Sequence, residues 1–281
     1  MAFTANPEQS PLGKTTEYVD QYDPSLLFPI PRAPKREEIR LSEISDAERL
    51  PFFGQDIWNA FELSWLNFKG KPQAAVAVFR IPANSPNIIE SKSFKLYLNS
   101  FNQTRLEAVS QLQGRLEQDL SAAAGDTVLV ELYSLDEAQA LQVEQLQGRC
   151  IDDLDIEVEH YHPEPELLKI QGDMVVEEQL FSHLLRSNCP VTGQPDWATV
   201  QVSYKGKKID KAGLLAYIIS FRLHNDFHEQ CVERMFVDIT QRCQPEELTV
   251  VARYTRRGGL DINPWRSSNR PDMENQRLIR Q

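Results

Sequence analysis

A cysteine and an aspartate stand seven residues apart in the run SNCPVTGQPDW, residues 187–197. A thiol among polar, turn-forming neighbours can be accessible, and it is a strong nucleophile once it ionises. A carboxyl group on the far side of the Gly-Gln-Pro turn can exchange protons with it. The spacing makes Cys189 a candidate nucleophile and Asp196 a candidate general acid. The pair is also open to a simpler interpretation, a small core cysteine and an aspartate that bonds within a turn or at a strand edge.

A second candidate group is NDFHEQCVE, residues 225–233. A carboxylate such as Glu229 can accept two N–H bonds from the edge of a guanine-like base, and His228 stands beside it. The same spacing fits a capping box, in which Glu229 and Asp226 only fix the start of a helix. Both interpretations remain open from the sequence.

The third group is built for anions. Residues 90–95, ESKSFK, begin with a further acceptor, Glu90, and continue with residues suited to hold phosphate: Ser91, Lys92 and Lys95. The run RRGG, residues 256–259, adds two guanidinium groups and exposed backbone N–H groups. The alternative is a pair of solvated basic segments. The sequence has no G-x-G-x-x-G for a Rossmann site, and no H-E-x-x-H or C-x-x-C for a ready zinc site.

Periodic patterns predict the elements that position these residues. Strands are predicted at 72–81, 125–135, 196–206 and 247–259, and helices at 99–123 and, in two pieces, at 211–240. An offset of 120 residues relates YLNSF (97–101) to YIISF (217–221), and places Asp210 opposite Glu90. We therefore expect an internal duplication in which each copy runs strand, strand, helix, helix, strand, strand, an α+β module with helices on one sheet face. Complementary polar residues in the two copies suggest one composite site.

The chain divides into four predicted segments. They are an N-terminal arm (1–55), a first module (56–143), a connector (144–175) and a second module (176–281).

Composition limits the kinds of partner that the protein can bind. The net charge of −11 argues against a nucleic-acid or anionic-membrane surface. No apolar run reaches membrane-spanning length, and the N-terminus lacks a secretory pattern. Four widely spaced cysteines fit a reduced cytoplasmic compartment.

Taken together, these segments resemble the NADPH-dependent nitrile reductases of queuosine biosynthesis in tRNA modification, the 7-cyano-7-deazaguanine reductases, in their long two-module form. The segments that carry the resemblance are IESKSFKLYLNSFNQTR (89–105), SNCPVTGQPDW (187–197), FHEQCVER (227–234) and ARYTRRGGLDINPWR (252–266), with DIWNAFELSWLN and LGKTTEY in support.

The resemblance implies a tunnelling fold with two ββααββ modules, a homodimer, a small deazapurine substrate, NADPH as co-substrate and no metal. It implies that Cys189 is the nucleophile and Asp196 the proton donor, and that a covalent thioimide forms on Cys189. Implied substrate-binding residues are Ile89, Glu90, Ser91, His228 and Glu229. Implied NADPH-binding residues are Ser91, Lys92, Arg257 and Gly258.

Two rival functions remain at this stage. A purine- or pterin-handling hydrolase of the same fold would use Cys189 and His228 as zinc ligands. A duplicated scaffold without catalysis would bind a purine and turn nothing over. Metal analysis separates the first rival from the reductase, and the intact Cys189 and Asp196 argue against the second.

Overall fold

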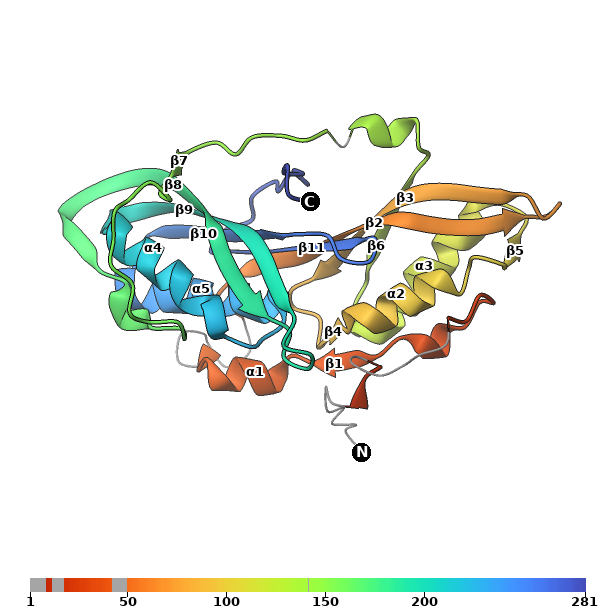
Figure 1. The fold of residues 1–281 in the computed structure, drawn as a ribbon, viewed down its shortest axis with the longest axis horizontal. Coiled ribbons are helices and arrows are strands. Elements are labelled where there is room, and N and C mark those ends of the chain that lie inside the picture. Colours follow the sequence, from red (N-terminus) through yellow and green to blue (C-terminus); the bar gives the residue numbers. More distant parts are fainter. Residues whose placement is uncertain (1–8, 12–17, 42–49, 141) are drawn as a thin grey trace. The chain divides into compact units, whose positions relative to one another are not determined.

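The computed structural model describes residues 9–11, 18–41, 50–140 and 142–281 (Figure 1). The predicted N-terminal arm is therefore described only in part, and all but the last residue of LGKTTEY lies outside these ranges. The described residues form two compact units. Unit 1 lies within Met1–Pro34, Asp56–Gln142 and Arg256–Ile262, and unit 2 within Lys35–Gln55, Val143–Thr255 and Asn263–Gln281. The four predicted segment boundaries stay a prediction.

Unit 1 places two helices, α2 (Ser91–Asn99) and α3 (Val109–Ala124), on one face of a sheet (Figure 1). The sheet contains β6, β3 and β2 as neighbours in that order, and β3 and β6 are antiparallel. The strands are β2 (Phe53–Asn67), β3 (Pro72–Pro82), β6 (Leu129–Tyr133), the short pair β1 (Pro29–Pro31) and β4 (Asn87–Ile89), and β5 (Arg105–Leu106), which runs parallel to the end of β2. Two short 3-10 helices, η2 (Pro24–Leu26) and η4 (Glu137–Ala140), complete unit 1. The helix α1 (Ala33–Glu38) begins with residues of unit 1 and continues with residues of unit 2.

The core of unit 1 follows from two periodicities. Alternate residues of the strands, such as Trp58 and Phe79, meet a stripe on α3 whose leucines are fully buried: Leu112, Leu116 and Leu120. Replacing one of these leucines by alanine costs about 2–5 kcal/mol. The predicted helix over 99–123 began too early, because Leu106 belongs to β5 and Val109, the first residue of α3, is exposed.

Unit 2 repeats the arrangement with longer strands. β8 (Ile170–Asn188) and β9 (Pro195–Ile209) form an antiparallel hairpin, β10 (Glu247–Tyr254) pairs with β9, and β11 (Leu260–Ser267), whose first residues lie in unit 1, pairs with β10. Two helices follow the hairpin, α4 (Lys211–Ser220) and α5 (His228–Cys243), separated by η6 (Phe221–Leu223). The prediction of two helical pieces is confirmed. The predicted connector contains β7 (Arg149–Cys150) and η5 (Pro165–Leu167).

The duplication is visible in matching hydrogen bonds. Tyr97 Oη donates to Asp119 over 2.7 Å in unit 1, and Tyr217 Oη donates to Asp238 over 2.6 Å in unit 2. Each tyrosine also packs edge-on against the phenylalanine four residues later, at 5.4 Å between ring centroids in both units. The two first helices have acidic N-caps at the predicted offset, Glu90 for α2 and Asp210 for α4.

The order strand, strand, helix, helix, strand, strand is complete in unit 2. In unit 1 the helices are followed by β6, after which the described chain continues into η4 and unit 2. Mixed helices and antiparallel strands confirm the predicted α+β class.

Candidate active site

Cys189 lies in the turn that joins β8 to β9 in unit 2. Its N–H donates to the Gln194 carbonyl over 2.9 Å, and its carbonyl accepts from the Gly193 N–H over 3.0 Å, so the turn is closed on itself. Gly193 has a φ of +68°, in the left-handed region that glycine adopts without strain. The side chain of Cys189 is 6% exposed. The thiol is thus sheltered at the end of a hairpin.

The segment before α5 holds this turn in place. The Asn188 N–H donates to the His224 carbonyl over 2.8 Å, and the Asp226 N–H donates to the Asn188 carbonyl over 3.1 Å. These bonds fasten the residue before Cys189 next to the N-terminus of α5, where unpaired helical N–H groups favour negative charge.

Asp196 and His228 form the central pair of unit 2. Asp196 is the second residue of β9, is 3% exposed, and has its Oδ1 3.2 Å from His228 Nε2. His228 is the first residue of α5, and its ring stacks on Tyr254 of β10 with centroids 3.8 Å apart and planes 8° apart. His228 Nδ1 is buried without a hydrogen-bond partner. A strand carboxyl and a helix imidazole can therefore exchange a proton in a sheltered place.

The start of α5 does not have the capping-box geometry. The N-cap is Phe227, which makes no side-chain capping bond, and Asp226 Oδ1 instead accepts from the Phe227 N–H over 3.0 Å. Glu229 is 3% exposed and lies in the first turn. The alternative in which Asp226 and Glu229 form a capping box is therefore wrong.

The other three cysteines are poor nucleophiles. Burial is the main cause that raises the pKa of Cys150, raises that of Cys243 to about 11, and raises that of Cys231 further. Their thiols stay protonated near neutral pH, and the thiolate is the reactive form.

In unit 1, Glu90 is the N-cap of α2. Its carboxylate accepts from the Lys92 N–H at 2.6 Å and from the Ser93 N–H at 2.8 Å, and its own N–H donates to the Phe28 carbonyl at 2.9 Å. The side chain is fully buried, and this burial raises the pKa of Glu90 against the opposing effect of the backbone bonds. Ile89 ends β4 and pairs with Pro29 of β1. The capping role is visible; a further role toward a substrate stays a prediction.

A glycine turn that contains two of the predicted cofactor residues, Arg257 and Gly258, lies against Lys95 of α2. Arg257 and Leu260 exchange backbone bonds of 2.9 and 3.2 Å across Gly258 and Gly259, whose φ angles of +57° and +80° define a type I′ hairpin turn. A Cβ on Gly258 would lie 2.4 Å from Lys95 Nζ, so the ammonium group rests against the turn. Lys95 is one turn along α2 from Ser91 and Lys92.

A cavity of about 380 Å³ opens beside this contact, lined among others by Glu62, Lys95, Gly258 and Gly259. An ammonium group against a glycine turn with a cavity beside it fits the phosphate end of a dinucleotide. The sequence pointed to Lys95 as a phosphate ligand, but its contact with Gly258 is a product of the tertiary structure.

The predicted site residues therefore fall into two sets. Unit 2 brings together Asp196 and His228 and places Cys189 and Glu229 nearby in the same fold. Unit 1 carries Ile89, Glu90, Ser91, Lys92, Arg257 and Gly258. Sequence reasoning missed Tyr254 and Asn188; only the pairing of strands and loops shows that they support the site. That the two sets form one composite site stays a prediction.

The fold and these residues define an α+β protein with a cysteine, an acid and an imidazole gathered at one hairpin. Two family models match: "Nitrile reductase, 7-cyano-7-deazaguanine-reductase N-term" over residues 18–132 and "QueF-like protein" over residues 195–273.

Relatives extend the match to nearly the whole chain. NADPH-dependent 7-cyano-7-deazaguanine reductases from Chromobacterium violaceum and Burkholderia lata are 60% and 59% identical, covering 94% and 98% of this chain and 93% and 100% of their own. The chain belongs to this reductase family. With the family established, the zinc-hydrolase alternative loses its support. That the two modules form a tunnelling fold stays a prediction.

Among solved structures, the apo form of the archaeosine synthase QueF-Like matches with a TM-score of 0.31 and 17% identity, over 36% of this chain and 100% of that chain. A likeness this slight carries no conclusion. No helix within the described residues has the length and apolar character needed to cross a membrane.

Proposed function

We propose that this chain reduces the nitrile of 7-cyano-7-deazaguanine to the aminomethyl group of 7-aminomethyl-7-deazaguanine, with Cys189 as nucleophile and Asp196 as proton donor. The observation that carries the assignment of residues is the 3.2 Å contact between Asp196 and His228, because Asp196 lies at the end of the β8–β9 hairpin whose turn contains Cys189. Family membership supports the reaction and the use of NADPH.

The first step forms a bond between Cys189 Sγ and the nitrile carbon. The nitrile nitrogen takes up a proton from Asp196, which gives a covalent thioimide; His228 replaces that proton across its contact with Asp196. Covalent attachment is useful because a protonated thioimide accepts hydride much better than a nitrile does.

The remaining steps add four electrons. Bound NADPH supplies one hydride at each of two stages. After the first, the C–S bond breaks, Cys189 leaves as thiolate and an imine remains; after the second, a proton completes the amine. The sum is one nitrile, two NADPH and two protons giving one amine and two NADP⁺.

The binding residues are assigned on the same basis. We assign the deazaguanine to Ile89, Glu90, Ser91, His228 and Glu229, and NADPH to Ser91, Lys92, Arg257 and Gly258. Buried carboxylates such as Glu229 suit the N–H groups of a purine edge. We further propose a homodimer that works in the cytoplasm on a free small molecule for the queuosine pathway.

Mass spectrometry of the protein mixed with 7-cyano-7-deazaguanine, without NADPH, tests the covalent step. We expect one substrate mass on the peptide that contains Cys189. A Cys189→Ala variant should bind the substrate but gain no mass, whereas a Cys243→Ala variant should gain it like the wild type. Normal turnover by Cys189→Ala would refute the covalent mechanism. Loss of NADPH absorbance should give two NADPH per substrate.

A further inference from the structure

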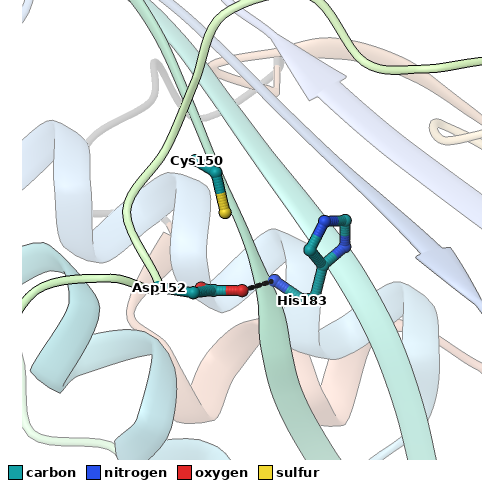
Figure 2. Close-up of side chains that lie close together, drawn as sticks. All are labelled: Cys150, Asp152 and His183. Atoms are coloured by element: carbon teal, nitrogen blue, oxygen red, sulfur yellow. Dashed lines mark hydrogen bonds between the residues drawn. The ribbon is translucent and has the colours of Figure 1, made fainter.

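A group of metal-ligand side chains lies elsewhere in unit 2. Cys150, Asp152 and His183 each offer one ligand atom, and these three atoms lie within 4.8 Å of one another. Figure 2 shows the thiol, the carboxylate and the imidazole around one small space. Within the described part of the chain this is the group of three or more such residues that meets the spacing of a metal site.

Strand pairing creates the group. β7 runs parallel to β8, with Cys150 opposite Phe181, and the Ile151 N–H donates to the Phe181 carbonyl over 3.0 Å. The chain then turns so that Asp152 Oδ2 accepts from the His183 N–H over 2.9 Å. This backbone bond fixes the carboxylate against β8.

The Asp152 carboxylate has a weak partner in the Cys150 thiol, and a side-chain hydrogen bond between them contributes to the raised pKa of Cys150. Asp152 Oδ1 is buried and has no nitrogen or oxygen donor. A thiol is only a weak donor, so a bound cation would satisfy this carboxylate better.

His183 is already oriented as metal-bound imidazoles are. Its Nδ1 lies 2.9 Å from Thr199 Oγ1, and Thr199 is 3% exposed. When the threonine oxygen accepts the Nδ1 proton, Nε2 carries the lone pair that a metal needs. Such outer bonds fix the tautomer and orientation of ligand histidines.

The histidine of the group borders a cavity. This cavity of about 520 Å³ is lined by residues that include Phe181, His183, Thr199 and Arg280, whereas Cys150 and Asp152 are not among its lining residues. The side chains of Cys150, Asp152 and His183 are each partly exposed. This partial exposure lets an ion reach the group and leaves room for a water as the fourth ligand.

We propose that Cys150, Asp152 and His183 bind a divalent transition metal, zinc in the first place. A thiolate, an imidazole and a carboxylate oxygen are the ligand types of zinc, which takes four ligands in a tetrahedron. Cys150 would release its thiol proton to solvent as the ion binds. The ion would fasten the segment around β7 to β8. It is separate from the reductase chemistry, which has Cys189 and needs no metal.

Cobalt(II) titration of the full-length, metal-free protein tests the site. The Cys189→Ala background removes the reactive thiol, so that thiolate-to-cobalt charge-transfer absorption reports on the remaining cysteines. We expect one cobalt per chain, tetrahedral d–d bands, and displacement by zinc. Adding Cys150→Ser should abolish the charge-transfer absorption.

Matched substitutions separate the ligands from their surroundings. His183→Gln and Asp152→Asn should weaken binding, whereas the neighbouring exposed Asp153→Asn and the buried Cys243→Ala should leave it unchanged. Thr199→Val should weaken binding about 10-fold. Zinc should raise the Tm of the wild type and not that of Cys150→Ser.

Two results would overturn the proposal. One is a charge-transfer band that survives Cys150→Ser in a folded protein, as judged by circular dichroism. The other is the absence of stoichiometric cobalt or zinc binding by the wild type. Because turnover and adduct formation are measured without added metal, failure here leaves the proposed reductase activity untouched, and the converse also holds.

Discussion

At the scale of single residues, the chemistry depends on neighbours that are far apart in the chain. Asp196 comes from a strand and His228 from a helix start, and their contact of 3.2 Å is sheltered from solvent. Tyr254 from a third element stacks on the imidazole and fixes its plane. A carboxyl held in this way can give up and regain a proton without moving.

Asp196→Asn should therefore slow formation of the thioimide by about 10²- to 10⁴-fold, because the amide cannot deliver a proton. Rapid mixing followed by mass spectrometry measures this rate. Asp210→Asn is the matched control: asparagine also caps helices, so α4 and the rate should both survive. Equal rates for the wild type and Asp196→Asn would remove Asp196 from the mechanism.

Gly258→Ala should raise the KM for NADPH with little change in kcat. The new methyl group would displace Lys95 Nζ from the turn, and the residue would be held at a φ of +57° at a cost of about 1–2 kcal/mol. Gly172→Ala is a control for the strain alone, since its φ is +81° and nothing lies within 4 Å of its added Cβ. A KM rise of equal size in both variants would count against the cofactor role.

At the scale of elements, helix starts and helix pairs carry the repeated features. Glu90 caps α2 with its carboxylate, and the tyrosine of each first helix bonds an aspartate of the second. Apart from the half-buried Asp119, these groups are buried, so their protonation and their hydrogen bonds contribute to stability.

The contribution of Glu90 should depend on pH. Because burial raises its folded pKa above the ordinary 4.5, the bound proton stabilises the folded state below that value and this stabilisation is lost as the pH rises through the folded pKa. Relative to Glu90→Gln, the wild-type free energy of unfolding should thus fall as the pH rises from the ordinary pKa of 4.5 through the raised folded pKa. Urea unfolding measures it.

Glu137 provides the opposite control. Bonds from the Ser134 N–H and hydroxyl lower the pKa of this exposed carboxylate, so its small stabilisation is lost as pH falls. The difference between wild type and Glu137→Gln should have the reverse slope. A flat difference for Glu90→Gln would mean that its burial does not affect its protonation.

Tyr97→Phe and Tyr217→Phe should each lower the free energy of unfolding, by up to about 1–3 kcal/mol, because each removes a hydroxyl donor from an aspartate. The loss should be smaller for Tyr97→Phe, since Asp119 is half-buried and also accepts from Tyr22 Oη over 2.7 Å. The two bonds share no partner, so the double variant should lose the sum. Chemical denaturation of the four proteins checks this. Strong non-additivity would show that the two bonds are energetically coupled.

At the scale of the whole molecule, the prediction concerns the number of chains in the assembly, for which we propose a homodimer. Sedimentation equilibrium should give twice the mass of one chain over a wide range of concentrations. A monomer with full activity would show that neither substrate nor cofactor binding needs a second copy.

Much of the site could be predicted because its signals are local. The turn after Arg257 could be predicted because glycine tolerates positive φ. The repeated Tyr–Ser–Phe pattern indicated the duplicated helices. The start of α3 was placed too early because Leu106 fits helical spacing yet pairs as β5. Glu229 was open to a capping-box interpretation because spacing cannot show which residue begins a helix.

The sequence by itself determined the class of fold, the duplication, the family and the candidate residues, since periodicity and residue type act over short distances. Only the tertiary structure decided that His228 meets Asp196, that Lys95 meets Gly258, and that Cys150 and Asp152 meet His183. These side-chain contacts depend on strand register and helix packing. A shift of one residue in register would turn each strand side chain to the other face of its sheet.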